Sequence, residues 1–485
     1  MAGTPGEWLF DPRKFLIIFC CLQLLIYAER GAFASNGINA SLKEEFSLSL
    51  IEDGLLPAAF MVGLLISSPI FAEAAKHTRA FYLIAIGLSI WAAAVFVSGL
   101  SIGFFSLLLC RMAVGVGEAS FVALAAPFID DVAPPQAKAK WLAIFFLCIP
   151  CGFALGFLYG GLVASSLGWR FAFFIEGASA IPFIILSYNA PAMMDLRGTH
   201  NEEEQDTLNG ERHQNLAAAH NTLSPRLNEA GRDMLKLAER PLYLWVVAGM
   251  TAYTAVVGTM SYYGPQAATA LFAISPRSVD LAFGGLTVFT GVVGTLSGGL
   301  LLDRWGSTLQ NGTYLCFLGL ASGSVFLILA FVLTKSFYTF CLVFSLGQCA
   351  MFSTMAPGNA IVMWSVPPGL RPLAISLSVV AMHLLGDVPA PPLAGLLQSK
   401  VQNWRITMAV LACLLILGAG FYLIGVVAAK TAIDFRNVEE IGGGVENGAD
   451  GEEFYEDGSS IHSSVRISTS IPPPEGRTTP EETLL

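Results

Sequence analysis

Two groups of ionisable residues lie inside long apolar stretches of this sequence, where charged side chains are rare. The first group occupies the stretches 15–37 and 104–128, and its members are Glu29, Arg30, Arg111 and Glu118. The second group lies in the stretch 373–396 and consists of His383 and Asp387. A charge at the centre of a bilayer costs about 2.5–3.5 kcal/mol on insertion scales, so such residues are usually paired and functional. If these stretches cross a membrane, both groups are candidates for proton transfer or for holding a polar group of a cargo.

The spacing within the first group predicts two ion pairs. Arg111 and Glu118 are seven residues apart, which puts them on one face of a helix, roughly 10 Å apart along its axis. Glu29 and Arg30 are neighbours, so their side chains point about 100° apart. We predict that Glu29 pairs with Arg111 and that Arg30 pairs with Glu118. We interpret the pairs as a proton-coupling network, in which a protonated carboxylate releases its arginine; a static network that only holds the fold is the alternative.

The second group precedes a run of prolines. His383 and Asp387 are four residues apart and share one helix face. Pro389, Pro391 and Pro392 follow, and they should break or kink the helix and free backbone carbonyl groups. The pair is therefore a candidate substrate site or second proton site. A structural hydrogen bond, a metal-ligand pair and an intramembrane hydrolase are alternatives, although one His and one Asp fall short of a metal site and no nucleophile motif accompanies them.

Other acidic residues are weaker candidates. Glu176 follows Trp169 and Arg170 closely, so a local pair with Arg170 is one interpretation and a functional role is the other. Four further carboxylates fall near the ends of apolar stretches, where charge costs little: Asp53, Asp130, Asp131 and Asp280.

The composition requires that membrane helices position these residues. Charged residues make up 13% of the 485 residues and apolar residues 54%, whereas soluble domains carry roughly 25% charged residues. With a mean hydropathy of +0.63, this excludes a soluble enzyme, a coiled coil and a wholly disordered chain. Apolar stretches of membrane-spanning length occur at 15–37, 53–75, 81–100, 104–128, 141–163, 171–190, 242–263, 279–302, 312–334, 337–364, 373–396 and 406–428.

A long polar segment divides the twelve predicted helices into two groups of six. We predict a cytoplasmic N-terminus at 1–14, six-helix halves at 15–190 and 241–430, a cytoplasmic central loop at 191–240 and a disordered acidic tail at 431–485. With both termini inside, 18 Lys and Arg residues fall on the cytoplasmic side and six on the other, as the positive-inside rule requires. The sequence thus predicts an all-α membrane protein with the two-half architecture of a secondary transporter.

A short motif between the eighth and ninth stretches predicts a tight turn. It contains Gly299, Asp303, Arg304 and Gly306. The glycines permit the bend, Asp303 can face the positive N-terminus of a neighbouring helix, and Arg304 can hold a charge on an adjacent loop. We interpret this element as a cytoplasmic gate that is latched when the transporter faces outward.

Several of these strings resemble a known family. The motif at 299–306 resembles the signature loop of the major facilitator superfamily, and 111–119 resembles its fourth-helix motif. Within that superfamily, the strings at 115–120 and 383–387 are similar to the spinster family, and those at 34–39 and 125–131 to its plant members. The resemblance covers about 10–430. One departure is that the first helix carries Glu29 before Arg30, where the family usually has Asp.

The resemblance implies proton-linked transport of sphingoid or lysophospholipid molecules at late endosomal, lysosomal or vacuolar membranes. Composition alone leaves a carrier of small polar metabolites open, as well as a non-transport sensor or scaffold that recruits partners through its acidic tail. We expect no enzyme activity, no cofactor, no metal, no nucleic-acid partner and a monomeric protein. No nucleotide-binding motif of the G-x-x-x-x-G-K-[ST] type is present in the sequence, so the sequence does not favour an ATP-driven pump.

Overall fold

The computed structural model describes residues 12–75, 78–134, 138–189, 232–367 and 370–436. Within these residues, twelve helices are long and apolar enough to cross a membrane. The expected all-α membrane architecture is confirmed. The predicted N-terminal segment and the acidic tail lie almost wholly outside the described residues, as does most of the predicted central loop; of that loop, 232–238 form a helix.

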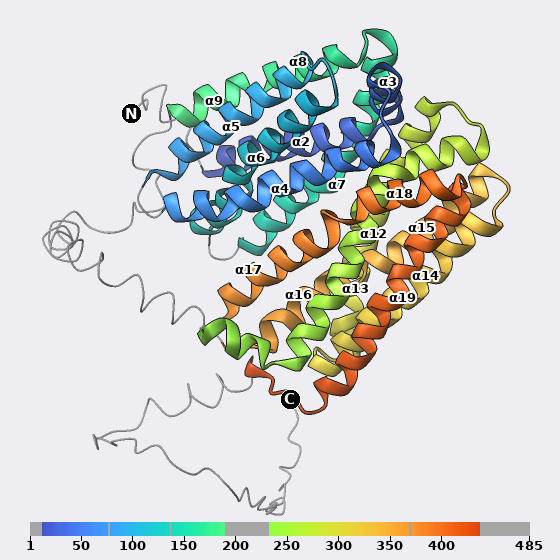
Figure 1. The fold of residues 1–485 in the computed structure, drawn as a ribbon. Helices are drawn as coiled ribbons and strands as arrows, with labels where there is room; N and C mark the ends of the chain where they lie inside the picture. The colour runs from blue at the N-terminus through green and yellow to red at the C-terminus, as the bar shows by residue number, and fades with distance from the viewer. Residues whose placement is uncertain (1–11, 76–77, 135–137, 190–231, 368–369, 437–485) are drawn as a thin grey trace, which may run out of the picture. The chain divides into compact units, whose positions relative to one another are not determined.

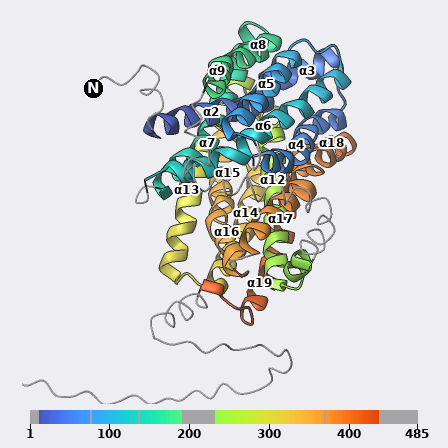
Figure 2. The same ribbon diagram turned by 90° about the vertical axis from the view of Figure 1, so that its left-hand side faces the viewer.

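The first six spans form one group of helices and the last six another (Figures 1 and 2). The first group contains α2 (Pro12–Ala34), α3 (Asn36–Phe46), α4 (Leu50–Ala74), α5 (Ala80–Ser98), α6 (Phe104–Val132), α7 (Lys138–Ser166), α8 (Trp169–Ser179) and α9 (Ile181–Tyr188). The second contains α12 (Pro241–Phe272), α13 (Pro276–Trp305), α14 (Leu309–Leu333), α15 (Phe337–Phe352), α16 (Met355–Trp364), α17 (Arg371–Met382), a π-helix η3 (His383–Asp387), α18 (Ala390–Val401) and α19 (Trp404–Ala429).

Glycines set the close helix packing in the first group. A Cβ on Gly115 of α6 would clash with the backbone oxygen of Phe60 on α4, and one on Gly156 of α7 would clash with the backbone oxygen of Ala28 on α2. Such small residues let membrane helices approach until their backbones touch. This packing fixes the positions of α2 and α6, the two helices that carry the first ionisable group.

The helix α3 is absent from our sequence-based prediction. Ser35 follows the end of α2 and caps α3, where its hydroxyl accepts a hydrogen bond from the backbone amide of Ile38 at 3.4 Å. The helix ends at Ser47, whose φ of 50° lies in the left-handed region. This short helix lies at one end of the bundle, where the chain turns back into α4. We call this end of the bundle the α3 end.

The two groups of helices meet mainly along two helix pairs. α4 packs against α18, and α7 packs against α13. Figure 1 shows α4 beside α18, with α17 diverging from α4. α4 also reaches η3. The eleventh span consists of α17, η3 and α18. The first half contacts α18 and η3 more than α17.

Candidate functional site

Both predicted ion pairs are present between α2 and α6. The Arg111 guanidinium binds a carboxylate oxygen of Glu29, and the Arg30 guanidinium binds Glu118. Glu29 and Glu118 are 0% exposed and Arg111 is 2% exposed. Because α2 and α6 make few backbone contacts with each other, these side chains provide the main polar connection between the two helices.

Aromatic rings cover the outer faces of both guanidinium groups. Arg111 lies 4.0 Å from the ring centroid of Phe33, and Arg30 lies 4.6 Å from Tyr27 and 4.5 Å from Phe60. A desolvated cation over an aromatic ring gains about 2 kcal/mol. Each arginine therefore keeps a favourable contact even when its carboxylate is neutralised.

The interpretation of Glu176 as a local partner of Arg170 is wrong. Arg170 instead binds Glu45 of α3, with Nη1 at 2.5 and 2.7 Å from the two carboxylate oxygens, while Trp169 Nε1 donates to Glu45 at 2.7 Å. Glu176 points into the protein, is 3% exposed, and has no hydrogen-bond partner at Oε2 among the described residues. Sequence reasoning placed Arg170 beside Glu176 because α3 was not predicted.

The Glu45 contact gives a testable pH dependence. Hydrogen bonds from Arg170 and then from Trp169 lower the pKa of Glu45 below its ordinary value of 4.5. A lowered folded-state pKa stabilises the protein above the unfolded value, and this stabilisation is lost as the pH falls through the folded value. We expect Glu45→Gln to lower the melting temperature at pH 6, with a difference from wild type that shrinks below pH 4.5. A difference that grows on acidification, measured by thermal unfolding in detergent, would contradict this account.

His383 and Asp387 lie together in the π-helix of the eleventh span. His383 Nδ1 and Asp387 Oδ2 are 2.6 Å apart, and Asp387 Oδ1 has no partner among the described residues. Oδ1 faces Gly258 of α12, where an added Cβ would lie 2.5 Å away. The predicted interruption of this helix is confirmed, and it takes the form of a π-helical turn, a feature that is frequent at functional sites. The described residues contain no cluster of three potential metal ligands.

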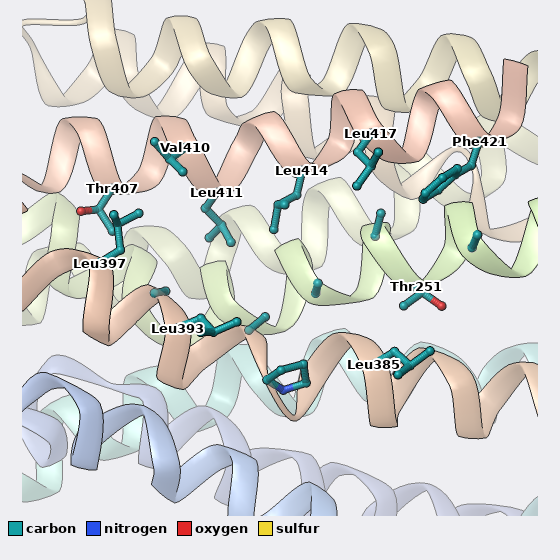
Figure 3. Close-up of a pocket in the computed structure, with 16 residues that line it drawn as sticks. Thr251, Leu385, Leu393, Leu397, Thr407, Val410, Leu411, Leu414, Leu417 and Phe421 are labelled. Atoms are coloured by element: carbon teal, nitrogen blue, oxygen red, sulfur yellow. The ribbon is translucent and has the colours of Figure 1, made fainter.

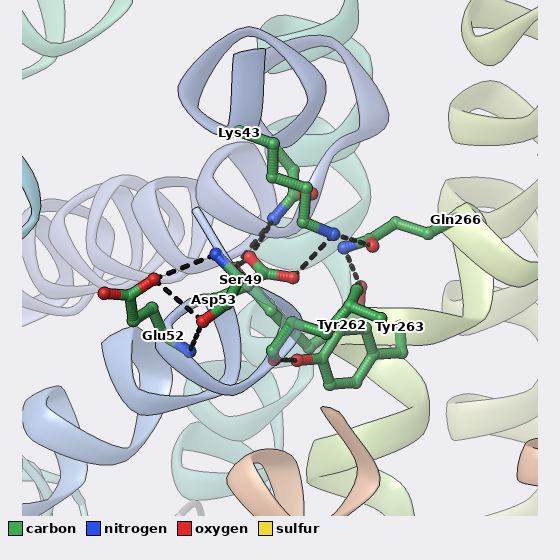
Figure 4. Close-up of polar contacts among 9 residues, drawn as sticks. Lys43, Ser49, Glu52, Asp53, Tyr262, Tyr263 and Gln266 are labelled. Carbon is green, nitrogen blue, oxygen red and sulfur yellow. Dashed lines mark hydrogen bonds and ion pairs between the residues drawn. The ribbon is translucent and has the colours of Figure 1, made fainter. Parts of the chain in front are cut away.

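A further polar network joins the two halves at the α3 end (Figure 4). Asp53 Oδ1 accepts hydrogen bonds from Asn39 Nδ2 at 2.8 Å and from the Tyr262 hydroxyl at 2.6 Å. Lys43 Nζ lies 2.6 Å from Asp53 Oδ2 and donates to Gln266 Oε1 at 2.6 Å. Asn39, Lys43 and Asp53 belong to the first half, and Tyr262 and Gln266 belong to α12, so this network connects the two halves at the α3 end.

Asp280 forms a second bridge between the halves at the same end. The backbone amide and the side-chain amide of Asn36 donate to Asp280 Oδ1 at 3.0 and 2.8 Å. Asp53 and Asp280 are 0% and 1% exposed. Their positions near helix ends suggested charge that costs little, but both side chains are buried in contacts between the halves. Asp130 and Asp131 lie in α6, and their side chains are outside the described set.

Weakening this network should favour opening of the α3 end. Asp53→Asn leaves a neutral side chain in place of the charge that holds Lys43, and Tyr262→Phe removes one hydrogen bond between the halves. We expect both variants to increase labelling of a cysteine placed at Thr269, a position on α12 outside the network whose hydroxyl is buried in the present structure, by a membrane-impermeant thiol reagent. The effect should be larger for Asp53→Asn. Ser41→Ala serves as the control because the Ser41 hydroxyl bonds only within α3, to Gly37. Unchanged labelling in both variants would show that the network does not hold this end closed.

The predicted gate motif forms the turn between α13 and α14. Gly306 adopts a φ of 87°, a conformation that favours glycine. Asp303 accepts a hydrogen bond from the Ser307 hydroxyl at 3.3 Å, and the side chains of Asp303 and Arg304 are exposed. Neither side chain forms an ion pair with any described residue. The latch is thus not formed here, and Gly299 lies on α13 one turn before Asp303.

An apolar groove of about 410 Å³ lies between α12, α18 and α19 (Figure 3). Leu393 and Leu397 point across it toward Leu411 and Leu414 of α19. Its two polar lining side chains are already satisfied, since the hydroxyl of Thr251 donates to the Val247 backbone and that of Thr407 to Gln398. The groove therefore offers a surface for hydrocarbon only.

Comparisons with known proteins agree with this architecture. Residues 19–391 match the Major Facilitator Superfamily. The chain is 43% identical over 432 residues to the Arabidopsis thaliana protein named "Probable sphingolipid transporter spinster homolog 2", covering 86% of this chain and 87% of the relative. It is 27% identical over 418 residues to the human "Protein spinster homolog 1", covering 81% of this chain and 74% of the relative.

Solved structures share the fold. A bacterial homolog of the human lysosomal transporter Spinster, in an inward-facing and unoccupied conformation, superimposes with a TM-score of 0.71 at 17% identity, covering 89% of this chain and 99% of that chain. The nucleoside transporter NupG superimposes with a TM-score of 0.64 at 12% identity, covering 85% of this chain and 98% of that chain. Since the relatives are named transporters, the expectation of a carrier rather than an enzyme is supported. The chain belongs to the spinster family of membrane transporters within the major facilitator superfamily.

Proposed function

We propose that this transporter moves a sphingoid or lysophospholipid-type amphiphile by alternating access and couples that movement to protons. The observation that carries the coupling is the pair of buried carboxylate–arginine contacts between α2 and α6. Both helix halves and both candidate sites lie on one chain, so we propose that a monomer is the working unit.

Protonation supplies a route by which α2 and α6 can separate. Pulling a charged buried pair apart leaves two uncompensated charges, and loss of one partner alone typically costs about 3–5 kcal/mol. A proton on Glu29 or Glu118 removes the negative charge, while Arg111 and Arg30 keep their aromatic contacts. Proton binding is thus favoured before the helices rearrange, which links the proton to the conformational step.

The contacts between the halves support two alternating states. The network around Asp53 and the Asn36–Asp280 bridge hold the α3 end closed in the present state. We propose that these contacts break in the other state and that Asp303 and Arg304 then latch the opposite end. The excess of basic residues at that opposite end supports a cytoplasmic location for it and for both termini, in a late endosomal, lysosomal or vacuolar membrane.

The cargo class rests on the named sphingolipid transporters among the relatives and on the chemistry of the eleventh span. Asp387 Oδ1 is buried and has no donor among the described residues, and the ammonium or hydroxyl group of a sphingoid base would supply one. The hydrocarbon chain of such a molecule fits apolar surfaces such as the groove between α18 and α19. We therefore propose that His383 and Asp387 bind the polar head of the cargo.

Competition in proteoliposomes tests the cargo. Labelled sphingoid base should be taken up, and unlabelled sphingoid base or lysophospholipid should compete whereas organic acids should not. Asp387→Asn should raise the apparent KM for sphingoid base by about tenfold, equivalent to about 1.4 kcal/mol of lost binding, because the carboxylate that pairs with the ammonium is gone.

The other outcomes separate the alternatives. Competition by organic acids instead of lipids would replace this proposal with a carrier of polar metabolites. An unchanged KM for Asp387→Asn, with lipid uptake intact, would remove Asp387 from the head-group site. Gln402→Glu, a change at the exposed end of α18, serves as the control for nonspecific effects of altering this helix.

A further inference from the structure

Glu176 is a further buried carboxylate in the half that carries the two ion pairs, and neither pair uses it. Its side chain is 3% exposed, and Oε2 has no hydrogen-bond partner in the described part of the chain. Glu176 interacts electrostatically with both Glu29 and Arg111. An ionised carboxylate in such a place is strongly unfavourable unless a cation pairs with it.

Aromatic side chains connect Glu176 structurally to the Arg111 pair. Phe173 lies one turn earlier on α8, and its ring centroid is 6.4 Å from that of Phe33 on α2. The Arg111 guanidinium stacks on the same Phe33 ring. The face of α8 that carries Phe173 and Glu176 is therefore turned toward the Glu29–Arg111 pair.

The helices packed against α8 add no competing cation near Glu176. α8 packs against α3, α5, α7 and α9. α5 and α9 contain no Asp, Glu, Lys, Arg or His, and their tyrosines, Tyr82 and Tyr188, are exposed. On α7, Tyr159 lies within Coulombic range of Glu176, but its hydroxyl donates to the backbone oxygen of Ala172 at 2.7 Å. The charged residues of α3 bind other partners or are exposed: Lys43, Glu44 and Glu45.

The charge balance of the whole cluster leaves one carboxylate in excess. Two guanidinium groups, those of Arg30 and Arg111, face three carboxylates, those of Glu29, Glu118 and Glu176. With every group ionised, the cluster carries one net negative charge inside the membrane. One bound proton makes it neutral, and like charges close together favour the sharing of such a proton between neighbouring acids.

We propose that Glu176 is an alternative partner for Arg111. A proton moves between Glu29 and Glu176, and Arg111 pairs with whichever of the two carboxylates is ionised. In the present state Glu176 holds the proton and Glu29 pairs with Arg111. In the exchanged state Glu29 holds the proton and Arg111 pairs with Glu176. The exchange breaks one O–H bond and forms another, and it leaves the total charge unchanged. This inference deepens the proposed function, because it names the acid that receives Arg111 when α2 is released.

Infrared spectroscopy of the purified full-length protein tests whether Glu176 holds the proton in the present state. The measurement needs neither cargo nor a pH gradient. Glu176→Gln should fold, because the native Oε2 makes no hydrogen bond with any described residue. The wild type-minus-E176Q spectrum at neutral pH should contain the carbonyl stretch of a protonated carboxylic acid. The matched wild type-minus-E118Q spectrum should lack it, because the proposal places the proton on Glu176 and leaves Glu118 paired with Arg30. Absence of the band in the first difference spectrum would overturn the proposal.

A second comparison tests the exchange itself. In Glu29→Gln, Arg111 has lost its present partner, so Glu176 should ionise and pair with it. The E29Q-minus-E29Q/E176Q spectrum should therefore lack the protonated-acid band. A band that persists in this spectrum would show that Glu176 stays protonated when Arg111 has no other partner. That result would contradict the proposed exchange. Because no lipid is present, a failure of lipid transport would leave these spectra unchanged, and the two proposals fail separately.

Discussion

Replacing Glu118 with glutamine should reduce gradient-driven lipid uptake by at least about tenfold, or about 1.4 kcal/mol in the coupled step, while the protein stays folded. Glutamine keeps the size of the side chain and accepts a hydrogen bond from Arg30, but it cannot take up a proton. Arg30 also retains its contacts with Tyr27 and Phe60. The measurement is initial uptake into proteoliposomes with an imposed pH gradient.

The specificity of this effect depends on a matched control. Glu44→Gln makes the same chemical change at an exposed position on α3 and should leave uptake unchanged. Exchange of labelled for unlabelled lipid at equal pH should fall less in Glu118→Gln than gradient-driven uptake does. Equal gradient-driven uptake by Glu118→Gln and wild type would remove Glu118 from proton coupling.

Replacing Arg111 with methionine should destabilise the protein by about 3–5 kcal/mol, because it leaves a buried carboxylate without its cation. Glu29 is 0% exposed and has no other cationic partner among the described residues. Glu29→Gln combined with Arg111→Met should recover most of that loss, since the neutral amide no longer needs the charge. Thermal unfolding in detergent of the single and double variants measures the effect.

The exposed ion pair of Arg170 and Glu45 at the α3 end is the reference against which the cost of Arg111→Met is compared. Arg170 and Glu45 form an ion pair whose side chains are 35% and 43% exposed, and exposed pairs contribute about 0–1 kcal/mol. Arg170→Met should therefore cost much less than Arg111→Met. If the two substitutions have similar costs, or if the double variant is no more stable than Arg111→Met, then the buried pair does not carry the energy assigned to it.

The cross-pairing of the first ionisable group was predictable because its causes are local. Charge is costly in a membrane helix, and the seven-residue spacing of Arg111 and Glu118 fixes one helix face. Two adjacent opposite charges on another helix then leave few neutral arrangements. The interruption of the eleventh span was also predictable from its prolines, although its π-helical form depends on how His383 and Asp387 meet α12.

The contacts at the α3 end were not predictable on this basis. Asn36 and Asp280 are separated by 244 positions in the sequence, and nothing near either residue indicates the other. Both Asp53 and Asp280 lie near helix ends, which normally indicates solvent. Their burial arises because the two halves meet there, and the position of α3 also redirects Arg170 away from Glu176.

These observations assign different roles to the two ends of the molecule. Polar contacts join the two halves at the α3 end, while the motif of Asp303 and Arg304 lies on the turn between α13 and α14 without an ion pair to any described residue. The buried α2–α6 pairs lie between them along the helices. In the proposed mechanism, proton binding at those pairs acts on the helix packing that both ends share.

The most direct test of proton-coupled lipid transport is uptake of a radiolabelled sphingoid base and a radiolabelled lysophospholipid into proteoliposomes, with and without an imposed pH gradient. We expect accumulation above equilibrium for at least one of these lipids, dependent on the gradient and abolished when a protonophore collapses it. Accumulation that ignores the gradient, or no uptake of either lipid by protein shown to be folded, would contradict proton-coupled lipid transport.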